Sequence, residues 1–309
     1  MDFDTEDIDI AHEFFPFLRV YKNGRVERHI LTSRVPPGLD PITGTQSKDI
    51  IISSDINLSA RIFIPKIETP KKLPLLVHFH GGGFCTGSAF CPITKYSLSN
   101  FVASAQIVAL SVDYRLAPEN PLPVAYEDSW VALKWAVAHA EEKGPETWLN
   151  EYADFKHVFL GGESSGANIA HHVALRASEP GNELDGFKIT GLSLVHPYFG
   201  VMEPDKLYQY LSPSSTGSYD DPMLNPAVDT NLGKLACDKV LVCVAGKDML
   251  KGRGIEYYKA LKASGFRGKV ELVETQGEGH CFHLLNSSRN NVPFLKKLAS
   301  FIRDDFQKS

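Results

Sequence analysis

The run GGESSGANIAHH contains a serine whose surroundings suit nucleophilic catalysis. Gly162, Ser164 and Gly166 match the pattern Gly-x-Ser-x-Gly. The pattern lies between an expected strand over 157–162 and an expected helix over 165–178. In that context it forms a sharp turn that projects the serine hydroxyl outward, and the glycines let the backbones approach closely. We therefore predict Ser164 as a nucleophile. Because small residues also occur in ordinary strand-to-helix turns, the prediction depends on catalytic partners elsewhere in the chain.

A serine hydroxyl needs a base to activate it, and the base needs an acid to orient it. Asp248 follows the expected strand KVLVCVAG, and His280 follows the expected strand KVELVET. The order Ser, Asp, His is the one that accompanies this serine turn, and open α/β sheets place their chemistry at the carboxyl ends of strands. We predict His280 as the base and Asp248 as its orienting acid. Taken singly, Asp248 could instead be a helix N-cap and His280 a solvated loop residue.

The run HGGGF follows another apolar strand and predicts donors for an oxyanion. Glycines have no Cβ atom, so they can turn backbone N–H groups into a cavity, and such donors stabilise the negative charge of a tetrahedral intermediate. We predict that the N–H groups of Gly81, Gly82 and Ser165 bind this oxyanion. Gly83 and Phe84 are candidates for lining the substrate pocket, with turn formation and ordinary packing as their alternatives. A phosphate-binding loop is less favoured, because the run lacks the Lys-Ser/Thr ending.

The elements that must hold these residues alternate between strands and helices along the chain. Apolar runs at 73–82 and 106–114 suit strands buried on both faces, and 125–142 has helical spacing. This alternation predicts one α/β domain over residues 1–309, with a mostly parallel sheet of about eight strands flanked by helices. The run around Asn23-Gly24 predicts a hairpin that adds antiparallel strands at one edge of the sheet.

Two segments do not fit this core. Residues 1–17 precede the first expected strand, and residues 200–222 separate two core strands. The second segment is rich in serine, proline and tyrosine, as active-site lids on loops often are. We predict that both segments form a small cap over the site. The alternative is that they are ordinary surface loops with no role at the site.

Composition excludes several classes of protein. The chain has 309 residues and a formal net charge of −5, with no basic block that would follow a phosphate backbone, so we expect no nucleic-acid partner. No apolar run approaches the roughly 20 residues of a membrane span. The acidic N-terminus does not resemble a secretion signal. The five cysteines include no Cys-x-x-Cys pair. We therefore expect a cytoplasmic protein with reduced thiols and no metal.

Five motifs in a fixed order carry a family resemblance: HGGGF, VDYRLAPE, GESSG, AGKDML and GEGHCFH. Together they resemble the hormone-sensitive-lipase-like branch of the α/β-hydrolase superfamily, and FLRVYKNGRVER and GESSGANIAHH resemble the plant carboxylesterases within it. The resemblance covers nearly the whole chain. It implies a serine carboxylesterase acting on small esters, either plant specialised metabolites or xenobiotics, without a metal or organic cofactor. Ser164, Asp248 and His280 match the family triad.

The same resemblance implies supporting roles and alternatives. Tyr114, Arg115 and Glu119 belong to the YRLAPE element, which we interpret as structural support for the oxyanion loop. The plant family also contains dehydratase- and cyclase-type lyases, and a small-molecule receptor that lacks the triad histidine. Because His280 is present here, a receptor is the less favoured alternative, and Ser164 favours acyl transfer over a lyase. The sequence leaves the oligomeric state open between monomer and homodimer.

Overall fold

The structure is a computed structural model, and it describes residues 9–69, 71–142, 144–184, 186–200, 203–285 and 288–306. A nine-stranded sheet forms its centre, in the order β12-β11-β10-β9-β7-β8-β6-β5-β4. These strands are β4 (Gly38–Leu39), β5 (Gln46–Ser53), β6 (Leu58–Ile64), β7 (Leu73–Phe79), β8 (Val108–Asp113), β9 (Ala153–Glu163), β10 (Ile189–Val195), β11 (Cys237–Ala245) and β12 (Lys269–Thr275).

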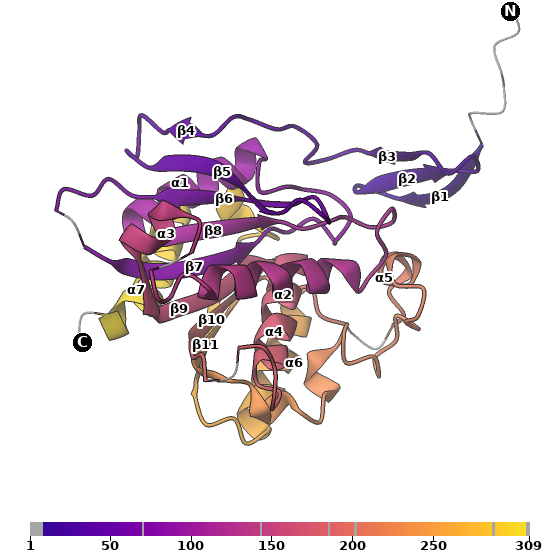
Figure 1. Cartoon of the computed structure of the whole chain (residues 1–309). Helices are drawn as coiled ribbons and strands as arrows, with labels where there is room; N and C mark the ends of the chain where they lie inside the picture. Colours follow the sequence, from indigo (N-terminus) through magenta and orange to yellow (C-terminus); the bar gives the residue numbers. More distant parts are fainter. Residues whose placement is uncertain are drawn as a thin grey trace, which may run out of the picture.

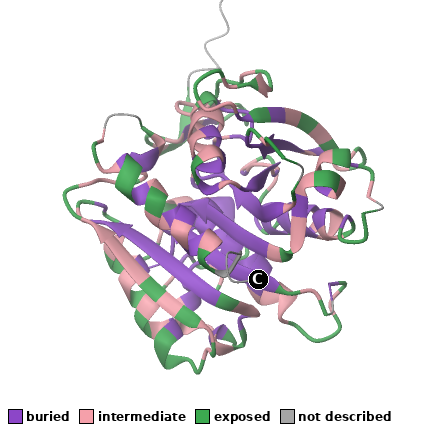
Figure 2. Ribbon diagram, turned by 90° about the vertical axis from the view of Figure 1, so that its left-hand side faces the viewer, coloured by how far each residue is buried: buried purple, intermediate pink, exposed green. Residues whose placement is uncertain are grey.

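The sheet is parallel over β7 to β12 and antiparallel at one side, where β6 pairs with β8 and β5 with β6. Every residue of β7 and β10 is buried. Burial on both faces explains the nearly continuous apolar run LPLLVHF of β7. Figure 2 shows the buried residues gathered in the central strands. The prediction of a mostly parallel sheet is confirmed.

Helices cover both faces of the sheet (Figure 1). On one face α1 packs against α7, and on the other α2 packs against α4 while α6 lies on β11. The helices expected over 125–142 and 165–178 form as α2 and α4. The sequence analysis did not predict α1, α3 or α5, although Pro92 at the first turn of α1 is a typical helix start. The helices are α1 (Pro92–Ala105), α2 (Val124–Val137), α3 (Thr147–Tyr152), α4 (Ser165–Ala177), α5 (Lys206–Leu211), α6 (Lys251–Ala263) and α7 (Asn291–Phe306), with short 3₁₀ turns at 226–228, 232–234 and 282–284.

The predicted hairpin forms, but not where it was expected. β2 (Leu18–Tyr21) pairs antiparallel with β3 (Val26–Arg28), and Gly24 has a φ of 87° in the turn between them. Together with β1 (Ile10–Phe14) they make a separate three-stranded sheet, so the expected placement at an edge of the main sheet is wrong. The antiparallel edge comes instead from β4, β5 and β6. A hairpin signal reports only the local turn and says nothing of which sheet the strands join.

The three-stranded sheet and α5 lie side by side in space, although they are far apart in the chain (Figure 1). Tyr210 of α5 packs its ring 5.1 Å from the ring of Phe14 and 4.5 Å from that of His12. The two predicted cap segments therefore contact each other. Residues 1–8 and 201–202 of those segments lie outside the described residues.

Candidate active site

Ser164 occupies the sharp turn between β9 and α4, with φ 55° and ψ −120°. A serine at positive φ is strained, at a cost on the order of 1–3 kcal/mol. The flanking glycines make the turn feasible, because a Cβ atom at Gly162 would lie 2.2 Å from the carbonyl oxygen of Phe79, and one at Gly166 only 1.9 Å from it. Ser164 is 9% exposed. Ser164 thus lies at the carboxyl end of β9, in the sharp strand-to-helix turn that the sequence predicted.

Asp248 and His280 meet at the same edge of the sheet. Asp248 follows β11 and His280 follows β12, and a hydrogen bond of 2.7 Å joins His280 Nδ1 to Asp248 Oδ2. The side chain of Asp248 is 1% exposed and that of His280 35%. Burial raises the pKa of Asp248, but hydrogen bonds from His280 and from the N–H of Leu250 outweigh it, so the pKa lies below its usual value. An ionised carboxylate therefore orients the imidazole.

Ser164 and His280 line one cavity of about 230 Å³ together with Gly82. Its remaining walls are mainly apolar and come from several distant segments, because the loops at the carboxyl edge converge there. Phe17 contributes from the turn after β1, so the described end of the first cap segment borders the cavity. Further lining residues are Pro16, Ile30, Leu31, Cys91, Ile93, Thr94 and Leu284. None of these residues belongs to a catalytic motif, so the sequence analysis did not predict them.

The glycine loop differs from the prediction at one position. The N–H of Gly81 donates a hydrogen bond of 2.8 Å to Glu163 Oε1, and this contradicts its predicted role as an oxyanion donor, because one N–H cannot point at both acceptors. The N–H groups of Gly82 and Gly83 have no hydrogen-bond acceptor among the described residues. At Gly82 φ is 121°, and a Cβ atom there would lie 2.2 Å from the carbonyl oxygen of Thr86. The loop therefore requires glycine at this position.

Glu163 is a buried carboxylate that sequence reasoning missed. Besides Gly81 it contacts His78, whose Nε2 lies 3.0 Å from Oε2 and whose Nδ1 lies 3.1 Å from Ser111 Oγ. Burial raises the pKa of Glu163, but the charge and hydrogen bond of His78 outweigh this and lower it to about 2. The available signal was its place inside GESSG, next to the nucleophile. Glu163 thus ties the serine turn to the glycine loop.

The YRLAPE element supports the glycine loop, as interpreted from the sequence. Tyr114 Oη donates a hydrogen bond of 2.7 Å to the carbonyl oxygen of His80. Arg28 forms an ion pair with Glu119 and also donates to the carbonyl oxygen of Cys85. Arg115 pairs with the buried Asp128 of α2. Tyr114 and Arg28 thus hold the backbone of the loop at His80 and Cys85, whereas Arg115 ties the YRLAPE element to α2.

Phe84 does not line the catalytic cavity. Its side chain is fully buried, and its ring packs between those of Tyr126, Tyr198 and Tyr208 at centroid distances of 5.8–5.9 Å. The φ of 62° at Phe84 turns the chain back into the core. The prediction of a pocket role for Phe84 is therefore wrong. Gly83 faces the cap instead, because a Cβ atom there would lie 3.3 Å from Leu207 Cδ2 and 3.5 Å from Phe17 Cε1.

His196 is a second residue that sequence reasoning missed. Its Nδ1 accepts a hydrogen bond of 2.9 Å from the N–H of Cys281, the residue after the predicted base. The ring is 1% exposed and lies 5.9 Å from that of His280. Burial lowers the pKa of His196 to about 3, so the ring is neutral at neutral pH. His196 therefore fixes the position of the loop that carries His280.

His196, His280 and Cys281 also bring three ligand atoms within 4.8 Å of one another. Metal ligation requires deprotonated groups. Burial raises the pKa of the Cys281 thiol well above its ordinary value, so it stays protonated. Both Nδ1 atoms are engaged, one with Cys281 N–H and the other with Asp248. The arrangement suits an oriented base better than a metal site.

The chain matches the model of a family described as having the alpha/beta hydrolase fold over residues 76–284. The chain belongs to this family. It is 43% identical to "Probable carboxylesterase 1" of Arabidopsis thaliana, over 97% of this chain and 99% of that protein. It is 45% identical to "Probable carboxylesterase 7" of the same plant, over 95% and 98%. It is also 41% identical to the 2-hydroxyisoflavanone dehydratase of Glycyrrhiza echinata, over 96% and 98%.

Solved structures show the same fold. An esterase from Pyrobaculum calidifontis superposes with a TM-score of 0.71 at 24% identity, covering 84% of this chain and 85% of that one. A carboxylesterase cloned from a metagenomic library superposes with a TM-score of 0.69 at 26% identity, covering 89% and 92%. Among the described residues, no helix is both long and apolar enough to cross a bilayer.

Proposed function

We propose that this α/β-hydrolase is a serine carboxylesterase in which Ser164, His280 and Asp248 form the catalytic triad. The observation that carries the proposal is the hydrogen-bonded Asp248–His280 pair, whose histidine lines one cavity with the strained Ser164. Relatives named as probable carboxylesterases support the same reaction class. Cys281 also lines the cavity, but burial raises the pKa of its thiol well above the ordinary value, which disfavours it as the nucleophile.

The proposed reaction has two steps. In the first, Ser164 Oγ attacks the ester carbonyl carbon while His280 Nε2 takes the hydroxyl proton. Asp248 holds the proton on Nδ1 and stabilises the imidazolium that forms. The tetrahedral intermediate then collapses, the C–O bond breaks, and His280 returns the proton to the leaving alcohol. In the second step, water attacks the acyl-enzyme with His280 again as base, releasing the acid and restoring Ser164.

We assign the oxyanion donors to Gly82, Gly83 and Ser165. Gly81 is replaced by Gly83 because the N–H of Gly81 is already bound to Glu163. Ser165 is the first residue of α4, so its N–H belongs to the donors that a helix leaves free at its N-terminus. The helix dipole at this end favours the same negative charge. Each such donor is typically worth about 2.7–4 kcal/mol of transition-state stabilisation.

The cavity suggests the kind of ester. A volume of about 230 Å³ with mainly apolar walls fits a short acyl chain or a small aromatic group. Among the described lining residues, Glu163 carries the only carboxylate, and it is already paired with His78. We propose small, uncharged carboxylic esters as substrates. All five cysteines are free, which supports a reducing compartment such as the cytoplasm. The first cap segment and α5 are proposed to cover the bound ester.

A dehydratase-type lyase is the second candidate, because a dehydratase is among the relatives at 41% identity. In that reaction His280 would remove a proton from carbon, and the donors would hold the enolate that forms. The enolate would then expel the neighbouring hydroxyl group by C–O cleavage, and the proton held by His280 would leave with it as water. Ser164 would not form a covalent bond. The two functions therefore differ in whether the serine hydroxyl is essential.

Hydrolysis of p-nitrophenyl acetate and butyrate by the wild-type protein and by Ser164→Ala tests the proposal. We expect turnover by the wild type and a loss of about 10⁴-fold or more in kcat for the variant, since triad members act as a unit. Mass spectrometry after treatment with an organophosphate should place the added group on Ser164. A folded wild-type protein that hydrolyses neither ester would contradict the esterase proposal. Equal turnover by both proteins would contradict the choice of nucleophile.

A further inference from the structure

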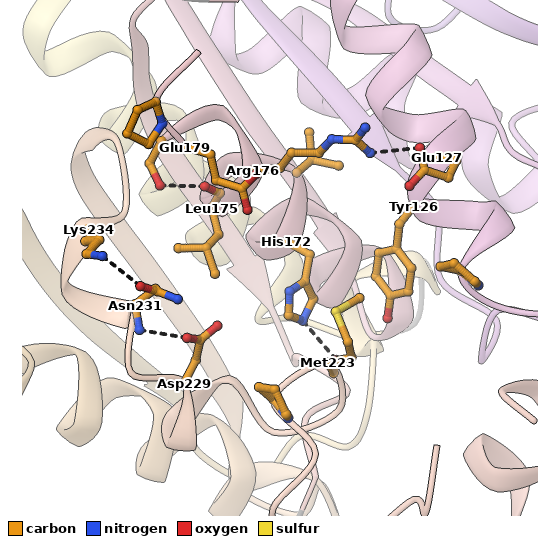
Figure 3. Close-up of a pocket in the computed structure, with 15 residues that line it drawn as sticks. Tyr126, Glu127, His172, Leu175, Arg176, Glu179, Met223, Asp229, Asn231 and Lys234 are labelled. Atoms are coloured by element: carbon orange, nitrogen blue, oxygen red, sulfur yellow. Dashed lines mark hydrogen bonds and ion pairs between the residues drawn. The ribbon is translucent and has the colours of Figure 1, made fainter. Parts of the chain in front are cut away.

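A second cavity, larger than the catalytic one, lies elsewhere among the described residues. It measures about 570 Å³ and lies between α2, α4 and the segment 222–234 (Figure 3). It shares no lining residue with the catalytic cavity. His172 on its wall is eight residues along α4 from Ser164, which places it about 12 Å from the nucleophile at 1.5 Å per residue. The proposed hydrolysis uses nothing in this second cavity.

His172 presents a hydrogen-bond acceptor to this cavity. Its Nε2 bonds the carbonyl oxygen of Met223 at 2.9 Å and must carry the proton, because a carbonyl only accepts. Burial lowers the pKa of His172 to about 4, so the ring is neutral and Nδ1 is a bare acceptor. The residue is 9% exposed, and Nδ1 has no partner among the described residues. In Figure 3 the ring lies between Leu175 and Tyr126, beside the open space.

The charged residues around the cavity add further acceptors. No cation among the described residues forms an ion pair with the carboxylates of Asp229 and Glu179, and Asp229 accepts only from the N–H of Asn231 through Oδ1. The two cations are engaged. Arg176 forms an ion pair of 2.8 Å with Glu127, and Lys234 bonds Asn231 Oδ1 at 2.9 Å. Three carboxylates, those of Glu127, Glu179 and Asp229, stand against these two cations, so the formal net charge of the lining is −1.

The rest of the lining is apolar and suits the body of a ligand. Val173, Leu175 and Met223 contribute side chains, and three prolines contribute rings at Pro123, Pro180 and Pro222. We propose that this cavity is a second small-molecule site, which binds a protonated primary amine on an apolar body. The ammonium donates to Asp229 and to His172 Nδ1, and the body packs on the apolar lining. Such a ligand leaves the catalytic cavity free.

Calorimetric titration with three probes of the same shape tests this site: phenethylamine, 2-phenylethanol and phenylacetate. Because phenethylamine has few atoms, we expect it to bind with a dissociation constant on the order of 1 mM. The neutral alcohol and the anion should bind at least about tenfold more weakly, since a hydrogen bond to a charged group is lost. Equal binding of the amine and the alcohol, or no saturable binding of the amine, would overturn the proposal.

Titration of substituted proteins tests whether the amine binds in this second cavity. Asp229→Asn keeps the acceptor for Asn231 and removes the charge, so it should weaken phenethylamine at least about tenfold. His172→Asn should weaken it as well. The control Glu256→Gln removes a carboxylate on α6 outside the cavity and should leave binding unchanged. If Asp229→Asn binds phenethylamine as tightly as the wild type does, the ammonium does not contact Asp229 and the proposed site is wrong.

The same titration, repeated with a blocked active site, tests whether the amine binds in the catalytic cavity instead. Phenethylamine should bind equally well after an organophosphate has blocked Ser164, because the two cavities share no residue. Binding that the organophosphate abolishes would assign the amine to the catalytic cavity and overturn the proposal. Ester hydrolysis by Asp229→Asn should match the wild type within about twofold, as expected for a surface change away from the chemistry.

Discussion

Glu163 stands beside the nucleophile without belonging to the triad, and it holds the N–H of Gly81 and the ring of His78. We predict that Glu163→Ala lowers kcat about 10–100-fold with little change in KM, because a displaced glycine loop misplaces the oxyanion donors. Glu163→Gln keeps an oxygen acceptor for Gly81 and should retain most of the activity. Ester hydrolysis with purified, folded variants checks this. Equal loss in both variants would rule out the hydrogen bond as the cause.

His196 acts one step further from the chemistry, through the backbone of Cys281. His196→Ala removes the acceptor and leaves a partly buried N–H unsatisfied, at a cost of about 1 kcal/mol in the free energy of unfolding. It should also lower kcat about tenfold, because the loop that carries His280 loosens. His196→Asn places an oxygen close to where Nδ1 was and should restore much of kcat. Urea unfolding and ester kinetics measure the two effects separately, and a failure of Asn to improve on Ala would speak against this role.

At the scale of elements, the turn after β1 and helix α5 cover the glycine loop. Phe17 lines the catalytic cavity, and Leu207 of α5 lies against Gly83. Phe17→Ala removes apolar contact area from the bound ester, which at about 25 cal/mol per Å² raises KM for p-nitrophenyl butyrate roughly three- to tenfold. The KM for p-nitrophenyl acetate should change less, because its shorter acyl chain contacts less of the Phe17 side chain. An equal rise for both esters would argue that Phe17 does not contact the acyl chain.

At the scale of the whole molecule, buried neutral histidines make stability sensitive to acid. Burial lowers the pKa of His172 and His283 to about 4 and that of His196 to about 3. In the unfolded chain each takes up a proton near pH 6.5, whereas the folded protein resists protonation down to these lower values. The unfolded state therefore binds more protons than the folded state between pH 6.5 and 4. As a result, the free energy of unfolding decreases as the pH is lowered through that window.

This linkage predicts a slope of about 1.4 kcal/mol per pH unit for each such histidine once the pH is well below 6.5. Urea unfolding at pH 7 and pH 5 measures it, above the range where the carboxylates titrate. The variant His172→Asn, which removes one of the three groups, should show a shallower dependence. An unfolding free energy that stays constant between the two pH values would contradict the prediction.

Local sequence patterns were enough to predict the fold class and the positions of the candidate nucleophile, base and acid. Ser164 could be placed because Gly-x-Ser-x-Gly acts through local backbone sterics, which the structure reproduces at Gly162 and Gly166. Asp248 and His280 could be placed because the carboxyl ends of parallel strands meet at one edge. The hairpin around Gly24 could be predicted because its turn also depends on local backbone conformation. The sheet that it joins could not be predicted in this way.

Contacts between residues far apart in the chain became visible in the folded molecule alone. Gly81 and Glu163 are 82 residues apart and His196 and Cys281 are 85 apart, so no local pattern reports their hydrogen bonds. Likewise, Phe84 belongs to a motif beside the cavity, but core packing with three tyrosines turned its ring away. Both cavities are walled by segments that only folding brings together. Side-chain direction and cavity shape depend on long-range packing, which residue types and spacing along the chain do not encode one segment at a time.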